Sequence, residues 1–290
     1  MRSIPRRRSL RPDPDIRVRK LRIPTEQGGI PALLLSPKTA VRDATGILWL
    51  HGGGYVAGMK EMVHMSRAVD LVKRFGAVVL APGYRLALRA PYPAALEDCY
   101  AALRYLERHA AALGVRSDQL MVGGESAGGG LCAAVCLQAR DEGTVNIAFQ
   151  MPLYPMLDDR DTETSRDNHG KVWNTRRNHL AWKLYLRGSD RAGLSPYAAP
   201  ARERDFSRLP PAYSFVGDGE PFCAETVRYF ENLRAAGVPA ELDIYRSDMH
   251  AFDMMAPDTP LSRQAAETFN RHFAQAQQRF FAPQREKGDV

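Results

Sequence analysis

Gly124-Glu125-Ser126-Ala127-Gly128 is a G-x-S-x-G pentapeptide that lies between two apolar runs. Before it, Leu120-Met121-Val122 predicts the end of a buried strand, and after it residues 128–138 (GGGLCAAVCLQ) predict a helix packed closely on a sheet. A strand, a sharp turn and a helix hold a serine on a strained backbone with its hydroxyl exposed, and glycines flank it because larger side chains would collide. The pentapeptide alone occurs often by chance. In this context it makes Ser126 the candidate nucleophile.

A glycine-rich loop earlier in the chain provides the second half of the pattern. His51-Gly52-Gly53-Gly54 follows the apolar run Gly46–Leu50, which predicts another short strand. Acyl transfer through a tetrahedral intermediate needs backbone N–H donors where the oxyanion forms, and glycines let the backbone approach that oxygen. We expect an oxyanion hole made from Gly52, Gly53, Gly54 and Ala127, the residue after the serine. Within the loop we favour Gly53 and Gly54 as donors.

The base must come from the four histidines that follow Ser126, which are His169, His179, His250 and His272. In a turn of this kind the serine is followed in the chain by the acid and then by the histidine. His169 and His179 precede any suitable acid strand, and His272 lies in a long amphipathic helix predicted over about residues 261–280. His250 follows the strand-like run 240–245 and a short polar loop, where parallel sheets place their chemistry. We therefore expect His250 to be the base.

The acid must come from the loop after the predicted strand Tyr213–Val216. Asp218 and Glu220 both stand just past the end of that strand. Glu220 precedes Pro221, which restricts its backbone to extended geometry and favours a fixed side chain aimed at the imidazole. We expect Glu220 to orient the imidazole and to stabilise the imidazolium, and Asp218 remains the alternative.

These motifs resemble the hormone-sensitive-lipase-like branch of the α/β-hydrolases, the bacterial esterase group. The resemblance covers roughly residues 25–280. Besides the two glycine motifs it rests on Tyr84-Arg85-Leu86-Ala87, Tyr92-Pro93-Ala94-Ala95, Ser195-Pro196-Tyr197-Ala198-Ala199-Pro200, Leu209-Pro210-Pro211-Ala212 and His250-Ala251-Phe252. In combination these runs are highly specific. The resemblance implies a serine hydrolase, and family analogy alone favours a homodimer.

The chain departs from the family pattern in three places. The family's acid is usually an aspartate in a D-P-L/F run, which aligns with Glu220-Pro221-Phe222; a glutamate keeps the carboxylate if the loop adjusts. The family's D-Y-R-L-A-P-E is replaced by residues 83–89, GYRLALR, which predicts altered support near the oxyanion loop and a changed surface charge. In the family's D-P-x-x-D-E, Glu225 remains while Ala224 replaces the aspartate.

The pattern of the whole chain predicts an α/β class, with a mostly parallel central sheet and helices on both faces. Residues 97–113 predict an amphipathic helix whose Ala102, Leu106 and Leu113 face the sheet. We divide the chain into a basic N-terminal segment (1–24) and an α/β-hydrolase catalytic domain (25–285). Residues 158–208 have little strand character and fall where the family inserts a lid, so we expect a small helical cap there.

The charge of the chain is concentrated at its beginning. The formal net charge is +7, and residues 1–22 carry nine basic and two acidic side chains, so the remainder is balanced. No nucleic-acid-binding module accompanies this segment, and we expect no nucleic-acid partner. Arg6-Arg7-Arg8 is not followed by the apolar region of an export signal, and no apolar run is long enough to span a membrane. We expect a soluble cytoplasmic protein without stable membrane insertion.

The four cysteines do not form a disulfide framework or a metal site. Cys132 and Cys136 are four residues apart on the helix after Ser126 and are expected to act as small hydrophobic side chains, while Cys99 and Cys223 are expected to be free thiols. Their spacing lacks matching histidine or aspartate clusters. We expect no metal and no cofactor.

The combined reading is a serine carboxylesterase that hydrolyses small, short-chain acyl esters through an acyl-enzyme intermediate. The short-chain preference is expected because the Arg-rich, proline-punctuated N-terminal segment is poorly suited to build a long apolar tunnel. An amidase or carbamate hydrolase would use the same residues, and the sequence does not separate these reactions. A non-catalytic small-ligand receptor on this fold is the alternative from another class, although such proteins typically lose the histidine of the triad.

Overall fold

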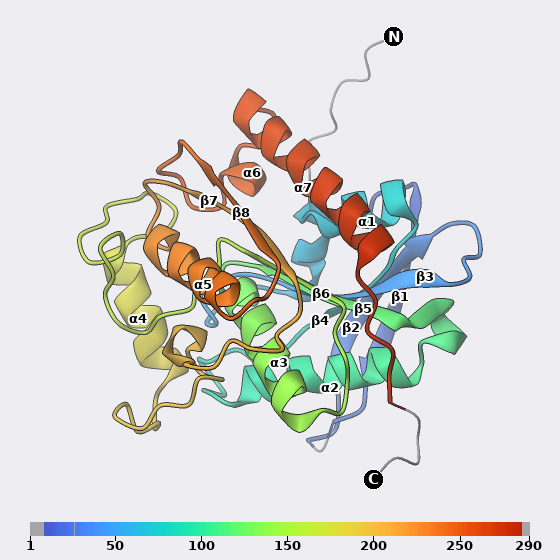
Figure 1. Ribbon diagram of the computed structural model, residues 1–290, viewed down its shortest axis with the longest axis horizontal. Helices are drawn as coiled ribbons and strands as arrows, with labels where there is room; N and C mark the ends of the chain where they lie inside the picture. The colour runs from blue at the N-terminus through green and yellow to red at the C-terminus, as the bar shows by residue number, and fades with distance from the viewer. Residues whose placement is uncertain (1–8, 26, 286–290) are drawn as a thin grey trace.

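A computed structural model of the protein describes residues 9–25 and 27–285. Within these residues one eight-stranded sheet has the order β1-β2-β4-β3-β5-β6-β7-β8 (Figure 1). The first two pairings are antiparallel and every pairing from β4 onward is parallel. The strands are β1 (Ile16–Ile23), β2 (Ile30–Pro37), β3 (Ala44–Leu50), β4 (Val78–Pro82), β5 (Val115–Glu125), β6 (Phe149–Leu153), β7 (Ala212–Gly217) and β8 (Ala240–Tyr245). The predicted mostly parallel α/β sheet is confirmed.

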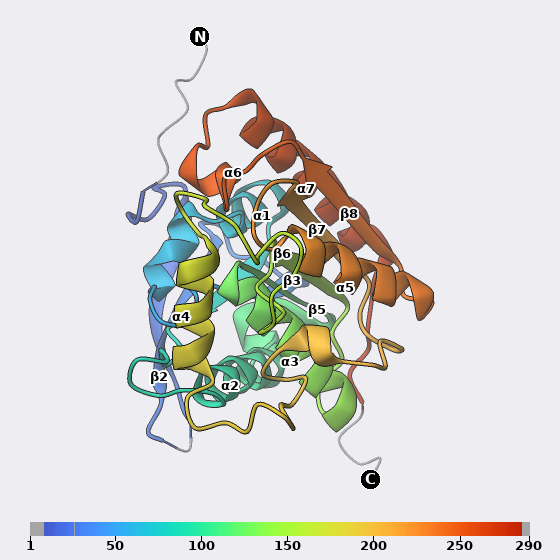
Figure 2. The ribbon, with the colours of Figure 1, turned by 90° about the vertical axis from the view of Figure 1, so that its left-hand side faces the viewer.

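Helices cover both faces of this sheet (Figures 1 and 2). The α-helices are α1 (Ala68–Phe75), α2 (Ala94–Arg108), α3 (Ala127–Glu142), α4 (Thr175–Tyr185), α5 (Cys223–Ala235), α6 (Phe252–Met255) and α7 (Pro260–Arg279), with 3-10 turns η1 (Lys60–Met65), η2 (Ala111–Leu113) and η3 (Pro200–Arg202). Apolar side chains of α2, α3 and α5 join one core, and those of α1, α6 and α7 join the other.

The alternation of side chains along the central strands creates these two cores. On β3, Leu48 and Leu50 belong to the core under α2 and α3, whereas Ile47 and Trp49 belong to the core under α1 and α7. Because all four are buried, β3 is apolar on both faces, as is typical of a central parallel strand.

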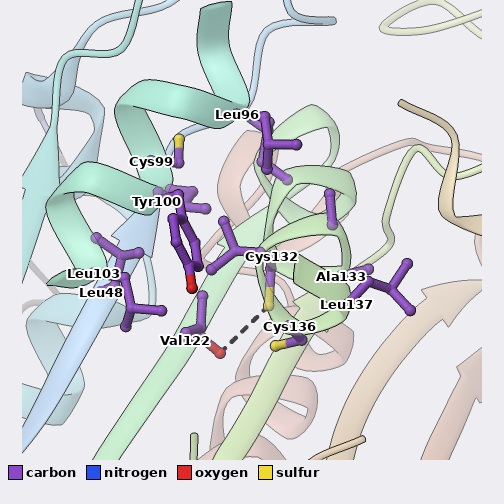
Figure 3. Packing of buried hydrophobic residues seen from close by; sticks show 14 of the residues in the cluster. Leu48, Leu96, Cys99, Tyr100, Leu103, Val122, Cys132, Ala133, Cys136 and Leu137 are labelled. Carbon is purple, nitrogen blue, oxygen red and sulfur yellow. Dashed lines mark hydrogen bonds between the residues drawn. The ribbon is translucent and has the colours of Figure 1, made fainter. Parts of the chain in front are cut away.

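Helix α3 packs closely on the sheet because the residues of its first turn are small. Figure 3 shows the packing of its following turns against β5 and α2. Cys132 and Cys136 lie on its buried face next to Val122 of β5, and the Cys132 thiol donates to the Val122 carbonyl oxygen at 3.4 Å. Cys99 and Cys223 are also buried free thiols. The predicted role of Cys132 and Cys136 as small hydrophobic side chains is confirmed.

The sheet begins earlier in the chain than the predicted boundary between residues 24 and 25. Strand β1 lies inside the basic segment and pairs with β2 along its whole length, from Ile16 to Ile23. Its basic side chains at Arg17, Arg19 and Lys20 are exposed, which suits an edge strand because charge there opposes pairing with another chain. Arg6-Arg7-Arg8 lies outside the described residues.

The predicted helix over residues 97–113 is also displaced. Helix α2 begins at Ala94 and ends at Arg108, and residues 111–113 form the separate turn η2. Ala102 and Leu106 face the core as expected, but Leu113 is only partly buried because it lies beyond the end of the helix. Residues 158–208, the predicted cap, carry α4 and η3 and no strand, and α4 lies outside the sheet in both views.

Candidate active site

Ser126 occupies a strained turn between the carboxyl end of β5 and the first residue of α3. Its φ of 58° and ψ of −119° are unfavourable for a residue with a side chain. A Cβ on Gly124 would lie 2.5 Å from the carbonyl oxygen of Gly128, and a Cβ on Gly128 would lie 2.1 Å from that of Leu50. Because those neighbours are backbone atoms, both glycines of the pentapeptide are sterically required.

Backbone hydrogen bonds hold this turn in place. The Ser126 N–H donates to the carbonyl oxygen of Leu153 at 3.0 Å, and the Ser126 carbonyl oxygen accepts from the N–H groups of Gly130 and Met156, each at 3.0 Å. The turn is thus bonded both to its own helix and to the end of the adjacent strand β6. These contacts fix the position of the Ser126 hydroxyl.

The structure brings Ser126, His250 and Glu220 into one hydrogen-bonded line. His250 Nε2 lies 2.8 Å from Ser126 Oγ, and His250 Nδ1 is hydrogen-bonded to Glu220 Oε2. The exposed fractions are 7% for Ser126, 4% for His250 and 1% for Glu220. The three groups therefore meet in a nearly dry environment, where charge interactions are stronger than in water.

The structure separates the two candidate acids. The loop that carries both is bonded to the loop before His250, since the N–H of Gly219 donates to the Ser247 carbonyl oxygen at 3.0 Å. Asp218 Oδ1 accepts from the Ser247 N–H at 3.0 Å, and its side chain is exposed. Glu220 is the acid whose carboxylate reaches the imidazole.

Burial and the histidine act in opposite directions on Glu220. Removal from water raises the pKa of the Glu220 carboxyl, while its contact with His250 works to lower it. Its other oxygen, Oε1, is buried and has no hydrogen-bond partner among the described residues. His250 is therefore the main polar group that stabilises this carboxylate.

The glycine-rich loop lies directly against the serine. A Cβ on Gly52 would be 3.2 Å from the Cβ of Ser126. Gly53 and Gly54 have φ values of 124° and 61°, conformations that glycine adopts readily. Within the described part of the chain, the backbone N–H groups of Gly53, Gly54 and Ala127 make no hydrogen bond to a protein acceptor. Such donors beside a nucleophile suit an oxyanion hole.

Comparison with known proteins identifies the family. Residues 47–254 match a family described as alpha/beta hydrolase fold. The chain belongs to this family. It is 32% identical over 256 residues to the esterase LipI of Mycobacterium tuberculosis, covering 87% of this chain and 80% of LipI. It is 32% identical over 244 residues to the carboxylesterase NlhH of the same organism, covering 81% and 75%. Both relatives belong to the hormone-sensitive-lipase-like group, which confirms the resemblance.

Solved structures agree with this assignment. A bacterial heroin esterase superimposes on this α/β-hydrolase with a TM-score of 0.86 at 31% identity, covering 92% of this chain and 86% of that one. A hyperthermophilic esterase from Pyrobaculum calidifontis gives a TM-score of 0.82 at 30% identity, covering 89% and 85%. These likenesses support carboxylic ester hydrolysis by a serine enzyme.

Tyr84 supports the glycine loop of this α/β-hydrolase. Its ring stacks on the imidazole of His51 with centroids 4.1 Å apart, and its hydroxyl donates to the His51 carbonyl oxygen at 2.7 Å. Burial lowers the pKa of His51 to about 4, so its ring is neutral at pH 7. Despite the changes in residues 83–89, Tyr84 thus still holds the start of the oxyanion loop.

Aromatic residues that sequence reasoning did not assign to the site enclose His250. Phe222 and Tyr154 meet the imidazole edge to face at centroid distances of 5.0 and 5.4 Å, and Trp173 lies at 6.4 Å. They come from the start of α5, the end of β6 and the segment 158–208. No local signal marks them, because aromatic residues at such separations usually belong to the core.

The other three histidines that follow Ser126 in the chain are not part of this hydrogen-bonded line. His179 contacts Asp161 at 2.7 Å, His169 is exposed, and His272 stacks on Tyr213 at a centroid distance of 4.0 Å. Over residues 9–25 and 27–285, no group of three histidine, cysteine or acidic side chains is arranged to hold a metal ion. In the same residues no helix has the length and apolar character needed to cross a bilayer.

Proposed function

We propose that this α/β-hydrolase is a serine carboxylesterase that cleaves small esters through an acyl-enzyme intermediate. The observation that carries the proposal is the buried line from Ser126 Oγ through His250 to Glu220, next to unpaired backbone N–H groups. The names of LipI and NlhH, an esterase and a carboxylesterase, support the same reaction.

We assign a role to each group on the basis of this geometry. Ser126 Oγ attacks the ester carbonyl carbon while His250 Nε2 accepts the hydroxyl proton. Glu220 holds the imidazole through Nδ1 and stabilises the imidazolium that forms. The N–H groups of Gly53, Gly54 and Ala127 stabilise the oxyanion, and His250 then protonates the leaving alcohol. A water molecule deprotonated by the same imidazole releases the acid.

The test is hydrolysis of p-nitrophenyl acetate together with covalent labelling by an organophosphate. We expect wild type to turn over the ester and to gain one organophosphoryl group, and Ser126→Ala to lose both, with kcat reduced at least about 10³-fold. A wild-type protein that is inactive on this and longer esters and unlabelled would support a receptor instead. Labelling accompanied by cleavage of p-nitroacetanilide but not of the ester would support an amidase.

We propose a preference for short acyl chains because Trp173 covers the site. A Cβ on Gly54 would lie 2.3 Å from Trp173 Cη2, so the indole rests directly on the oxyanion loop. The same ring reaches toward His250, and its Nε1 donates to Asn178 Oδ1 at 3.3 Å, which fixes its orientation. A rigid ring spanning from Gly54 to His250 leaves little room for a long acyl chain beside Ser126.

Shortening Trp173 should therefore change the chain-length profile. We expect Trp173→Ala to raise the ratio of kcat/KM for p-nitrophenyl octanoate over acetate by about 10-fold or more, since one methylene in an apolar pocket changes specificity by about 10-fold. Leu180→Ala, on an exposed residue of α4 in the same segment, is the matched control and should leave the ratio unchanged. Wild-type preference for octanoate, or an unchanged ratio in Trp173→Ala, would overturn this proposal.

A cytoplasmic location and a homodimer also remain our proposals. The location rests on the sequence pattern and the dimer on analogy with the family. Size-exclusion chromatography with light scattering measures the latter directly.

A further inference from the structure

A buried ion pair lies close to the triad but outside it. Arg67 Nε is 3.1 Å from Asp253 Oδ2, and the two residues are 2% and 0% exposed. Asp70 Oδ2 also approaches Arg67 Nη1 at 3.3 Å from the partly exposed side of the pair. Buried ion pairs add little net stability, because desolvation offsets their attraction. This pair therefore calls for an explanation other than stability.

Tyr154 connects the pair to the catalytic histidine. Its hydroxyl donates to Asp253 Oδ1 at 2.9 Å, and its ring meets the imidazole of His250 nearly perpendicularly, at 82° and 5.4 Å. Burial and the neighbouring Asp253 raise the pKa of Tyr154 well above its ordinary value, so the phenol keeps the proton that it donates. Arg67, Asp253 and Tyr154 thus form one chain of contacts that ends at the imidazole of His250.

Arg67, Asp253 and Tyr154 each lie on a segment that also carries or contacts a residue of the active site. Tyr154 follows Leu153, whose carbonyl oxygen holds the Ser126 N–H. Asp253 lies in α6, three residues after His250. Arg67 lies between η1 and α1, in the connection that continues from the glycine-rich loop. The ion pair and Tyr154 together therefore join three segments: the one that continues from the oxyanion loop, the one whose backbone is bonded to Ser126, and the one that carries His250.

We propose that the Arg67–Asp253 pair and Tyr154 form a positioning unit that holds the imidazole of His250 and neutralises the charge around it. The proposal rests on the catalytic role of His250 in the proposed function. Arg67 and Asp253 would not touch substrate; they act through Tyr154 and through the field at the imidazole. Asp253 acts to raise the pKa of Glu220, so without Arg67 its carboxylate would add an uncompensated negative charge near the Glu220–His250 pair.

Other titratable groups lie on the elements around His250, and Asp218 on the neighbouring loop is exposed. Glu220 is the direct partner from the loop before α5, and Cys223 from α5 stays a neutral thiol because burial raises its pKa to about 11. Glu125 of β5 carries a carboxylate bonded to Trp49 Nε1 at 3.0 Å.

The test is the pH dependence of kcat/KM on p-nitrophenyl acetate in three charge variants. Asp253→Asn keeps an oxygen for Tyr154 but removes the buried negative charge beside it and leaves Arg67 with Asp70 as its ion-pair partner, so the midpoint of the acid limb should move to lower pH by about half a unit. Arg67→Met leaves the Asp253 carboxylate unbalanced, so the midpoint should move to higher pH by a similar amount. The double variant Arg67→Met/Asp253→Asn should return close to wild type.

Asp118→Asn is the matched charge control. This substitution also removes one carboxylate from an ion pair, the pair with Arg116. Asp118 precedes Ser126 by eight residues, which corresponds to about 25 Å along the strand. The substitution should leave the midpoint unchanged. Midpoints of Asp253→Asn and Arg67→Met that move in the same direction, or not at all, would overturn the proposal, as would a double variant that keeps the shift of either single variant.

Tyr154→Phe tests the unit if a charge variant fails to fold. It removes the bond to Asp253 without changing charge, and we expect kcat to fall several-fold with an unchanged KM and midpoint. Unchanged kcat would contradict the proposal. A wild type with no ester hydrolysis and no organophosphate labelling would instead overturn the proposed function itself, so the two failures are distinguishable.

Discussion

At position 220 a glutamate stands where the resembled family usually has an aspartate. The longer side chain still reaches His250 Nδ1 because the loop that carries it is bonded to the Ser247 segment through Gly219. Asp218, two residues earlier, uses its carboxylate to cap the backbone of that same segment. The two acids therefore have different expected roles, one in orienting the imidazole and one in holding the loop.

Substitutions at these two positions should separate those roles. We expect Glu220→Gln to lower kcat on p-nitrophenyl acetate by about 10³- to 10⁴-fold, because the amide neither stabilises the imidazolium nor selects the correct tautomer. Asp218→Asn keeps an acceptor for Ser247 and should retain most of the activity. If Asp218→Asn proves to be the more damaging change, the assignment of the acid is wrong.

Two elements, β5 and α3, meet at the serine with almost no spare space. The turn between them is compatible only with glycine at 124 and 128, where an added Cβ would press against backbone carbonyl groups. Hydrogen bonds to the end of β6 and to the next turn of α3 hold the backbone of Ser126 in its strained conformation. Activity at this junction thus depends on the packing of two elements and not on the serine alone.

Gly128→Ala tests that packing. Since the new Cβ would lie 2.1 Å from the Leu50 carbonyl oxygen, β3 and α3 must separate, and we expect a loss of about 2 kcal/mol of unfolding free energy and about 100-fold in kcat. Gly188→Ala, at a φ of 85° with open space around it, should cost only about 1 kcal/mol and leave kcat unchanged. Urea denaturation and ester kinetics measure both, and equal effects of the two substitutions would contradict the steric argument.

The folding stability of the whole molecule should depend on pH through His51. Its imidazole is buried under Tyr84, and this burial lowers its pKa to about 4. In the unfolded chain the pKa of a histidine is about 6.5. Between these values the unfolded state binds more protons, so stability falls as pH decreases. His51 alone should account for a loss of about 2 kcal/mol between pH 7.5 and pH 5.

Urea denaturation at the two pH values checks this expectation. In His51→Asn the loss of stability on acidification should be smaller by about 2 kcal/mol than in wild type. His109→Asn, at an exposed histidine, should show the wild-type loss. An unchanged pH dependence in His51→Asn would mean that other buried groups dominate.

The features that depend on neighbouring residues could be predicted from the amino-acid sequence. The strand–turn–helix around Ser126, the glycine loop and the strand before His250 follow from short-range periodicity and steric rules, so the α/β class and the Ser126–His250 pair were predictable. That Glu220 and not Asp218 reaches the imidazole follows from the tertiary structure. It also decided that Trp173 covers Gly54, and that Arg67 and Asp253 meet beside Tyr154. These contacts join residues tens to nearly two hundred positions apart, and such distances are set by how the sheet and its loops pack, which no local pattern encodes.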